Sequence, residues 1–205
     1  VFDFMDGFAA RLLKSYSEIG KQLDSLSDVV SFGLAPGAIL FTLLEFSLFG
    51  KNQLIYEISG QWYEWLILFS VFLIPVFGAI RLARFNANSS EEPLFRGLPI
   101  PANGLLWASL GLILQSHGNQ EVFQLVYSTK NLLALGIITS GLMVINLPMF
   151  SLKFHSLNIK ENWYRYIFII IAVGLIVPFQ FFGLAFAIFT YIILNVVFYL
   201  LGVSY

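Results

Sequence analysis

The fold is decided where "DFMDGFAARLLKSYSEIGKQLDSLSD" (residues 3–28) meets "VVSFGLAPGAILFTLLEFSLF" (residues 29–49). The second stretch is apolar and about as long as a membrane span, which takes roughly 20 mainly apolar residues. The first stretch places four aspartates beside that span. A charged Asp at the centre of a spanning helix costs about 2.5–3.5 kcal/mol, and less near the interface. Aspartates retained at this position therefore indicate a functional site.

The composition is that of a membrane protein. Of the 205 residues, 58% are hydrophobic and only 11% are charged, against about 25% charged in soluble domains. We expect an all-α, polytopic transmembrane helical bundle. It should form a single integral membrane domain over residues 1–205, with a helix remnant at 1–15 and spans at about 20–48, 63–85, 100–117, 131–150, 163–179 and 181–202.

Charge and cysteine content exclude several classes of function. The net charge of −1 indicates no nucleic-acid partner. The absence of Cys excludes disulfides, a thiolate nucleophile and a Cys-based metal site.

The basic residues predict how the chain is oriented in the membrane. If the loops alternate sides, two cations fall on one side, Lys51 and Lys130. Nine fall on the other side: Arg11, Lys14, Lys21, Arg81, Arg84, Arg96, Lys153, Lys160 and Arg165. Because cytoplasmic loops carry the excess of Lys and Arg, we expect the second group, and the aspartates with it, to face the cytoplasm.

The aspartates share helix faces with small residues. At about 100° per residue, one arc of about 140° on the helix remnant holds five residues: Asp3, Asp6, Gly7, Ala10 and Arg11. On the next helix Gly20, Asp24 and Asp28 form a stripe about 80° wide. Two antiparallel helices joined by the polar "LKSYSEI" (13–19) can turn these faces toward each other, so that four carboxylates converge.

Converging carboxylates repel one another, and a divalent cation offsets that repulsion. Oxygen ligands without Cys favour Mg²⁺ or Mn²⁺, with Ca²⁺ as a further candidate. Gly7 and Gly20 leave room for a bulky group beside the helix backbones, and Arg11 offers a planar fork suited to phosphate. These residues together favour phosphoryl transfer, whereas intramembrane carboxylates alone are equally typical of an ion-coupled transporter.

The pattern D-x2-D-G-x2-A-R-x8-G-x3-D-x3-D resembles, at every fixed position, the signature of the CDP-alcohol phosphotransferases. The resemblance implies a helical membrane enzyme in which an alcohol attacks a CDP-linked substrate and CMP is released. It implies metal ligands at Asp3, Asp6, Asp24 and Asp28, with Asp28 also the general base. It implies a cytidine diphosphate site at Gly7, Ala10, Arg11 and Gly20.

Downstream segments narrow the resemblance to bacterial membrane-type phosphatidylserine synthases, over roughly residues 1–155. These segments are "LDSLSDVVSFGLAPG" (23–37), "RLARFN" (81–86), "FRGLPIPA" (95–102) and "LMVINLPMFSLKF" (142–154). The resemblance implies CDP-diacylglycerol and L-serine as substrates among membrane lipids of the bacterial inner (cytoplasmic) membrane. Side-chain chemistry offers four candidates for binding serine or the lipid phosphate: Arg81, Arg84, Asn86 and Arg96.

Other interpretations remain open from the sequence. Glycerol 3-phosphate or an inositol phosphate would be the acceptor in other phosphotransferases of this kind. A transporter or a catalytically silent scaffold would need no CDP-lipid. Against the family pattern, we expect one whole helix and most of another to be lacking before residue 1. Small-residue helix faces are compatible with a homodimer.

Overall fold

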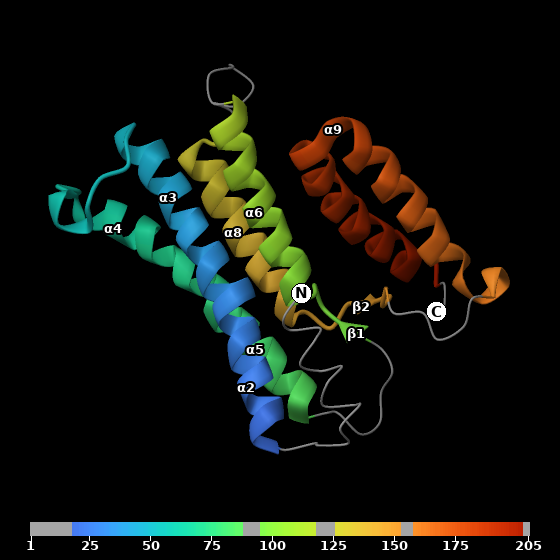
Figure 1. Ribbon diagram of the computed structural model, residues 1–205. Helices are drawn as coiled ribbons and strands as arrows, with labels where there is room; N and C mark the ends of the chain where they lie inside the picture. The colour runs from blue at the N-terminus through green and yellow to red at the C-terminus, as the bar shows by residue number, and fades with distance from the viewer. Residues whose placement is uncertain (1–17, 88–94, 118–125, 153–157, 203–205) are drawn as a thin grey trace.

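The computed structural model describes residues 18–87, 95–117, 126–152 and 158–202 (Figure 1). Its first segment is one continuous helical rod made of α2 (Glu18–Val29), a π-helical turn (Val30–Leu34) and α3 (Ala35–Phe49). Pro36 stands in the first turn of α3, where the wider turn before it accommodates a residue that has no N–H. The rod ends at Gly50, whose φ of 70° places it in the left-handed region typical of helix ends.

The second segment crosses back along the first. It consists of α4 (Trp62–Phe69), a 3₁₀ turn (Ser70–Phe72) and α5 (Leu73–Ala87). A capping box begins α4, in which the Gln61 amide donates to Glu64 Oε2 at 2.6 Å. Where the two segments cross, the Cβ of any larger residue at position 33 would lie 3.1 Å from Pro75 Cα. Gly33 therefore permits α5 to pack directly against the π-helical turn.

Two shorter helices and a two-stranded ladder complete the bundle. Helix α6 (Ile100–His117) is followed by α8 (Thr129–Val144), and β1 (Phe95–Arg96) pairs antiparallel with β2 (Pro148–Met149). The helix predicted over 131–150 ends instead at Val144, and Ile145 is already extended with ψ of 144°. Pro148 disfavours helical conformation in the residue before it. Residues 148 and 149 therefore form β2, which pairs with β1.

The C-terminal segment α9 (Ile159–Leu200) is a helical hairpin. Its chain reverses at Gln180, where φ is 49° and ψ is −115°. At Gly183 a Cβ would lie 2.0 Å from the Leu175 carbonyl oxygen, so the two arms can approach only because this residue is glycine. Figure 1 shows both arms running along the side of the bundle next to α6.

Three described helical segments are long and apolar enough to cross a bilayer: Gln22–Phe49, Trp62–Ala87 and Ile159–Leu200. Shorter apolar helices run over Ile100–Gln115 and Thr129–Val144. The core lies between α3, α4, α5, α6 and α8, with Leu44, Leu68, Ile74 and Trp107 fully buried. Large apolar side chains such as Ile170 and Val177 face outward, as lipid contact requires. The predicted all-α membrane bundle is confirmed.

Candidate active site

The second half of the aspartate motif lies on α2. Gly20 and Asp24 are exposed and Asp28 is partly buried, one helical turn apart along the same face. The other predicted residues of this motif lie outside the described residues: Asp3, Asp6, Gly7, Ala10 and Arg11. The convergence of four carboxylates therefore stays a prediction.

The C-terminal turn of α5 lies against this motif. Asn86 Nδ2 donates to Ser25 Oγ at 2.8 Å, and Ser25 directly follows Asp24. This interhelical hydrogen bond holds the last turn of α5 beside the carboxylates. Asn86 thus has a bond within the protein, and the structure leaves its predicted contact with a ligand untested.

Arg81 is the buried cation of the site. Only 9% of its surface is exposed, and its Nε has no hydrogen-bond partner. The guanidinium interacts electrostatically with Asp28 of α2 and with Tyr191 of α9. A buried N–H without a partner is unfavourable by about 1–3 kcal/mol, so an anion placed here would complete its bonding.

Arg84 and Arg96 are both exposed but differ in their surroundings. Arg84 Nη1 donates to the Val144 carbonyl at 2.9 Å. This bond ties α5 to the C-terminal end of α8, where a cation is favourable. Arg96 lies on β1 opposite Pro148.

The turn after Arg96 packs against the end of α8 and the residues that follow it. The Gly97 amide donates to the Leu147 carbonyl and the Leu98 amide to the Leu142 carbonyl, both at 2.8 Å. Gly97 has a φ of 75°, and a Cβ there would lie 2.5 Å from the Met143 carbonyl oxygen. Only glycine fits this turn, which fixes the path of the chain that carries Arg96.

The described donors suit a hard divalent cation. Asp24 and Asp28 supply carboxylate oxygens one turn apart, and the chain contains no Cys to favour a softer metal. Within the described ranges no three His, Cys, Asp or Glu side chains gather into a metal site. Two of the four expected ligands, Asp3 and Asp6, lie outside those ranges.

Comparison with known proteins assigns the family. The family model for CDP-alcohol phosphatidyltransferase matches residues 1–145. The chain belongs to the CDP-alcohol phosphatidyltransferase family. Similar curated proteins named CDP-diacylglycerol–serine O-phosphatidyltransferase come from Methanocaldococcus jannaschii, 30% identical over 165 residues, Helicobacter pylori, 32% identical over 177 residues, and Bacillus subtilis, 33% identical over 103 residues.

The aligned parts differ in extent among these relatives. They cover 74% of this chain and 72% of the archaeal protein, 85% and 64% for Helicobacter, and half of each chain for Bacillus. The family match includes the motif on α2 and the arginines of α5 and β1, but it ends before β2 and α9.

Sequence reasoning missed a contribution of α9 to the surroundings of this phosphatidyltransferase site. Tyr191, which interacts with Arg81, stands four residues before Asn195 in an otherwise apolar stretch, "YIILNVV" (191–197). Polar residues one turn apart inside an apolar membrane helix are the signal that could have found it.

Proposed function

We propose that this chain transfers the phosphatidyl group of CDP-diacylglycerol to the hydroxyl of L-serine, giving phosphatidylserine and CMP. The observation that carries the proposal is Arg81, a buried cation with an unpartnered Nε beside Asp28 of the family motif. Serine offers a carboxylate for such a cation and a hydroxyl for such a base. The names of the relatives support serine as the acceptor.

In the proposed reaction, the serine oxygen forms a bond to the phosphorus that carries the diacylglycerol. The bond from that phosphorus to the oxygen of CMP breaks, and CMP leaves with the electron pair. Asp28 accepts the hydroxyl proton. We propose direct attack without a covalent intermediate, since the chain has no Cys and its sequence shows no evident Ser–His pair. A trapped phosphatidyl-enzyme would contradict this.

The remaining residues of the motif bind and orient the substrates in this proposal. Asp3, Asp6, Asp24 and Asp28 would hold Mg²⁺ or Mn²⁺, or else Ca²⁺. When bound, the cation neutralises charge on the phosphate oxygens. Gly7, Ala10, Arg11 and Gly20 would accommodate the cytidine diphosphate. Arg81 and Arg96 would both pair with the serine carboxylate.

The test is CMP release by the full chain in lipid nanodiscs that contain CDP-diacylglycerol. L-serine, glycerol 3-phosphate and an inositol phosphate are compared as acceptors. We expect release with serine alone, and its loss when a chelator removes the divalent cation. Asp28→Asn should lower turnover by at least about a hundredfold. The matched control is Glu57→Gln, which removes an exposed carboxylate at the opposite end of the bundle and should leave turnover unchanged.

Other outcomes would separate the alternatives. CMP release with a phosphorylated acceptor would support the same phosphatidyl-transfer reaction but would contradict serine as the acceptor. No CDP-lipid-dependent release from folded protein would overturn the transferase and favour ion transport by the carboxylates. Equal activity of Asp28→Asn and Glu57→Gln would remove Asp28 from the reaction.

A further inference from the structure

The peptide groups on either side of Phe150, just after β2, are both bound by α9. The Phe150 amide donates to Asn195 Oδ1, and Tyr191 Oη donates to the Phe150 carbonyl, each at 2.8 Å. Asn195 Nδ2 donates in turn to the Tyr191 carbonyl at 2.7 Å. Asn195 is fully buried and Tyr191 nearly so. We call Phe150, Tyr191 and Asn195 the Phe150 clamp.

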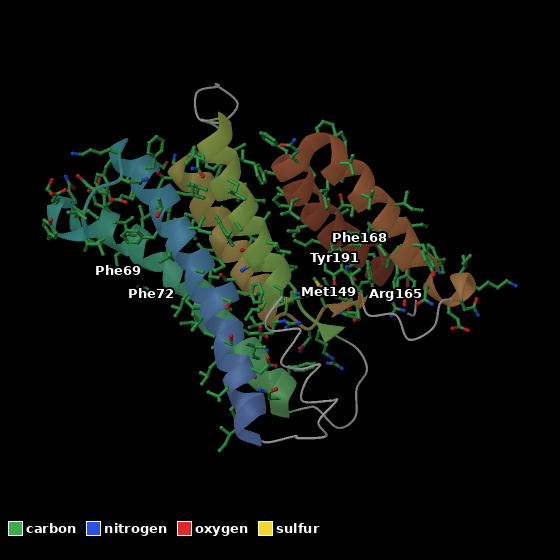
Figure 2. All side chains as sticks on the ribbon, viewed as in Figure 1. Phe69, Phe72, Met149, Arg165, Phe168 and Tyr191 are labelled. Carbon is green, nitrogen blue, oxygen red and sulfur yellow. The ribbon has the colours of Figure 1, made fainter. Side chains whose placement is uncertain are left out.

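The ring of Phe150 strengthens this attachment. Its centroid lies 5.0 Å from that of Tyr191 and 6.0 Å from that of Phe168, both in tilted or edge-on contact. Phe168 is on the first arm of α9 and Tyr191 on the second. Figure 2 shows Phe168, Tyr191, Arg165 and Met149 gathered at the end of α9 that meets β2.

A further contact holds the next residue of the same segment. Arg165 Nε, on the first arm of α9, donates to the Ser151 carbonyl at 2.7 Å. The guanidinium also donates from Nη1 to Asn162 Oδ1. Residues 150 and 151 are therefore attached to both arms of the hairpin.

This attachment is adjacent to the strand pair that carries Arg96. Met149, which precedes Phe150, pairs with Phe95, and Pro148 pairs with Arg96. Consecutive Cα atoms are about 3.8 Å apart, so Phe150 cannot move by much without moving β2. The Gly97 amide then bonds to Leu147, directly before β2, and the Leu98 amide bonds to Leu142 at the end of α8, so the residues that follow β1 are held to the same stretch of chain.

We infer that Tyr191 and Asn195 are positioning residues for the acceptor side of the site, where they fix Arg96 through Phe150 and the β1–β2 ladder. The inference rests on the proposed serine transfer for its kinetic consequence. The C-terminal hairpin, which lies beyond the family match, is thereby part of what determines how the acceptor alcohol binds. It acts without touching the reacting atoms.

Tyr127→Phe is a matched control for Tyr191→Phe, which removes one hydrogen bond of the clamp. Tyr191→Phe deletes one phenol oxygen that donates to a backbone carbonyl. Tyr127→Phe deletes the same atom from the same kind of bond, because Tyr127 Oη donates to the Leu110 carbonyl at 2.7 Å. Both tyrosines are almost fully buried, with 5% and 7% of their surfaces exposed. Tyr127 lies between α6 and α8, at the other end of the bundle.

The first measurement compares Michaelis constants in the CMP-release assay. Loss of one hydrogen bond corresponds to roughly a fivefold change. We expect Tyr191→Phe and Asn195→Ala to raise the KM for serine by about that factor or more, while the KM for CDP-diacylglycerol and kcat stay within about twofold. Tyr127→Phe should change none of these. Equal kinetics for Tyr191→Phe and Tyr127→Phe would overturn the role in acceptor binding.

The second measurement needs no activity. Amide hydrogen exchange is followed by mass spectrometry at Gly97 and Leu98 in the full chain in nanodiscs. Exchange there should be faster in Tyr191→Phe and Asn195→Ala than in the wild type or Tyr127→Phe. Unchanged exchange in both clamp variants would overturn the inference. If the clamp variants show faster exchange but the wild type shows no serine-dependent CMP release, the positioning stands and the proposed reaction fails.

Discussion

At the scale of single residues, the surroundings of Arg81 and Arg84 indicate a binding role for Arg81 and a structural role for Arg84. Both Arg81 and Arg84 lie on α5, three residues apart. Arg84 has a carbonyl partner on α8, whereas Arg81 is buried with an unpartnered Nε. Natural proteins tolerate such a cost mainly where function requires it. Arg81 is therefore the first residue to substitute in a test of serine binding.

We predict that Arg81→Lys lowers serine-dependent CMP release by about tenfold or more, because Lys keeps the charge but loses the planar fork, and hydrogen bonds to charged groups contribute about 1.5–3 kcal/mol. Arg84→Lys makes the same change one turn away and should lower release by less than about threefold. The assay is initial CMP release at subsaturating serine. Similar losses in the two variants would contradict a binding role specific to Arg81.

The burial of Tyr127 predicts that the free energy of unfolding decreases at high pH. Burial raises the pKa of its phenol from 10.0 to about 12, because the charged phenolate would be poorly solvated. In the unfolded chain the proton leaves near pH 10, so the folded state holds more protons between pH 10 and 12. Stability contributed by the neutral phenol is therefore fully present below pH 10 and is lost as the pH rises toward 12.

The measurement is the midpoint of thermal unfolding in detergent from pH 9 to pH 12. Other groups titrate over this range, so the wild type is compared with Tyr127→Phe. We expect the difference between their midpoints to shrink as the pH rises. Parallel curves would mean that the Tyr127 phenol ionises as readily in the folded protein as in the unfolded chain.

At the scale of elements, the turn between β1 and α6 depends on one glycine. Gly97→Ala places a Cβ 2.5 Å from the Met143 carbonyl oxygen at a φ of 75°, so we predict a loss of about 2 kcal/mol of unfolding free energy. Gly141→Ala is the control on α8, since a Cβ there meets nothing within 4 Å and helix propensity gains about 0.5–1 kcal/mol. The two variants and the wild type are compared by thermal unfolding. Unchanged stability of Gly97→Ala would show that the turn can rearrange.

Helices were predictable here because long apolar windows dominate the sequence. The end of α8 was not, since "INLPMF" (145–150) continues the apolar run while Pro148 and pairing with Phe95 turn it into a strand. By contrast, α6 begins at Ile100 with Pro101 in its first turn, where the missing N–H is no loss.

The candidate site was predictable only where spacing along one helix determines it. Asp24 and Asp28 follow from a 100° rotation per residue. The bond from Asn86 to Ser25 and the clamp of Phe150 by Asn195 join residues 61 and 45 positions apart. Such pairings depend on how helices cross, and no local pattern encodes that crossing.

At the scale of the whole molecule, the two ends of the bundle differ in charge. Arg81, Arg84 and Arg96 lie at the end that carries the aspartates and the β1–β2 ladder, while Lys51 follows α3 at the opposite end (Figure 1). The hairpin reversal at Gln180 lies away from the ladder, so both ends of α9 return to the basic end. This distribution favours a cytoplasmic active site, since basic residues are enriched in cytoplasmic loops.

The absence of Cys makes this orientation directly testable. Lys51→Cys and Lys160→Cys are the same substitution at exposed positions at opposite ends of the bundle. In bacterial spheroplasts that express the chain, a membrane-impermeant maleimide should label Lys51→Cys at once and Lys160→Cys only after lysis. Each variant retains the charge asymmetry, so neither should invert the topology. Labelling of Lys160→Cys in intact spheroplasts would place the aspartates outside, where neither a cytoplasmic CDP-lipid nor serine could reach them.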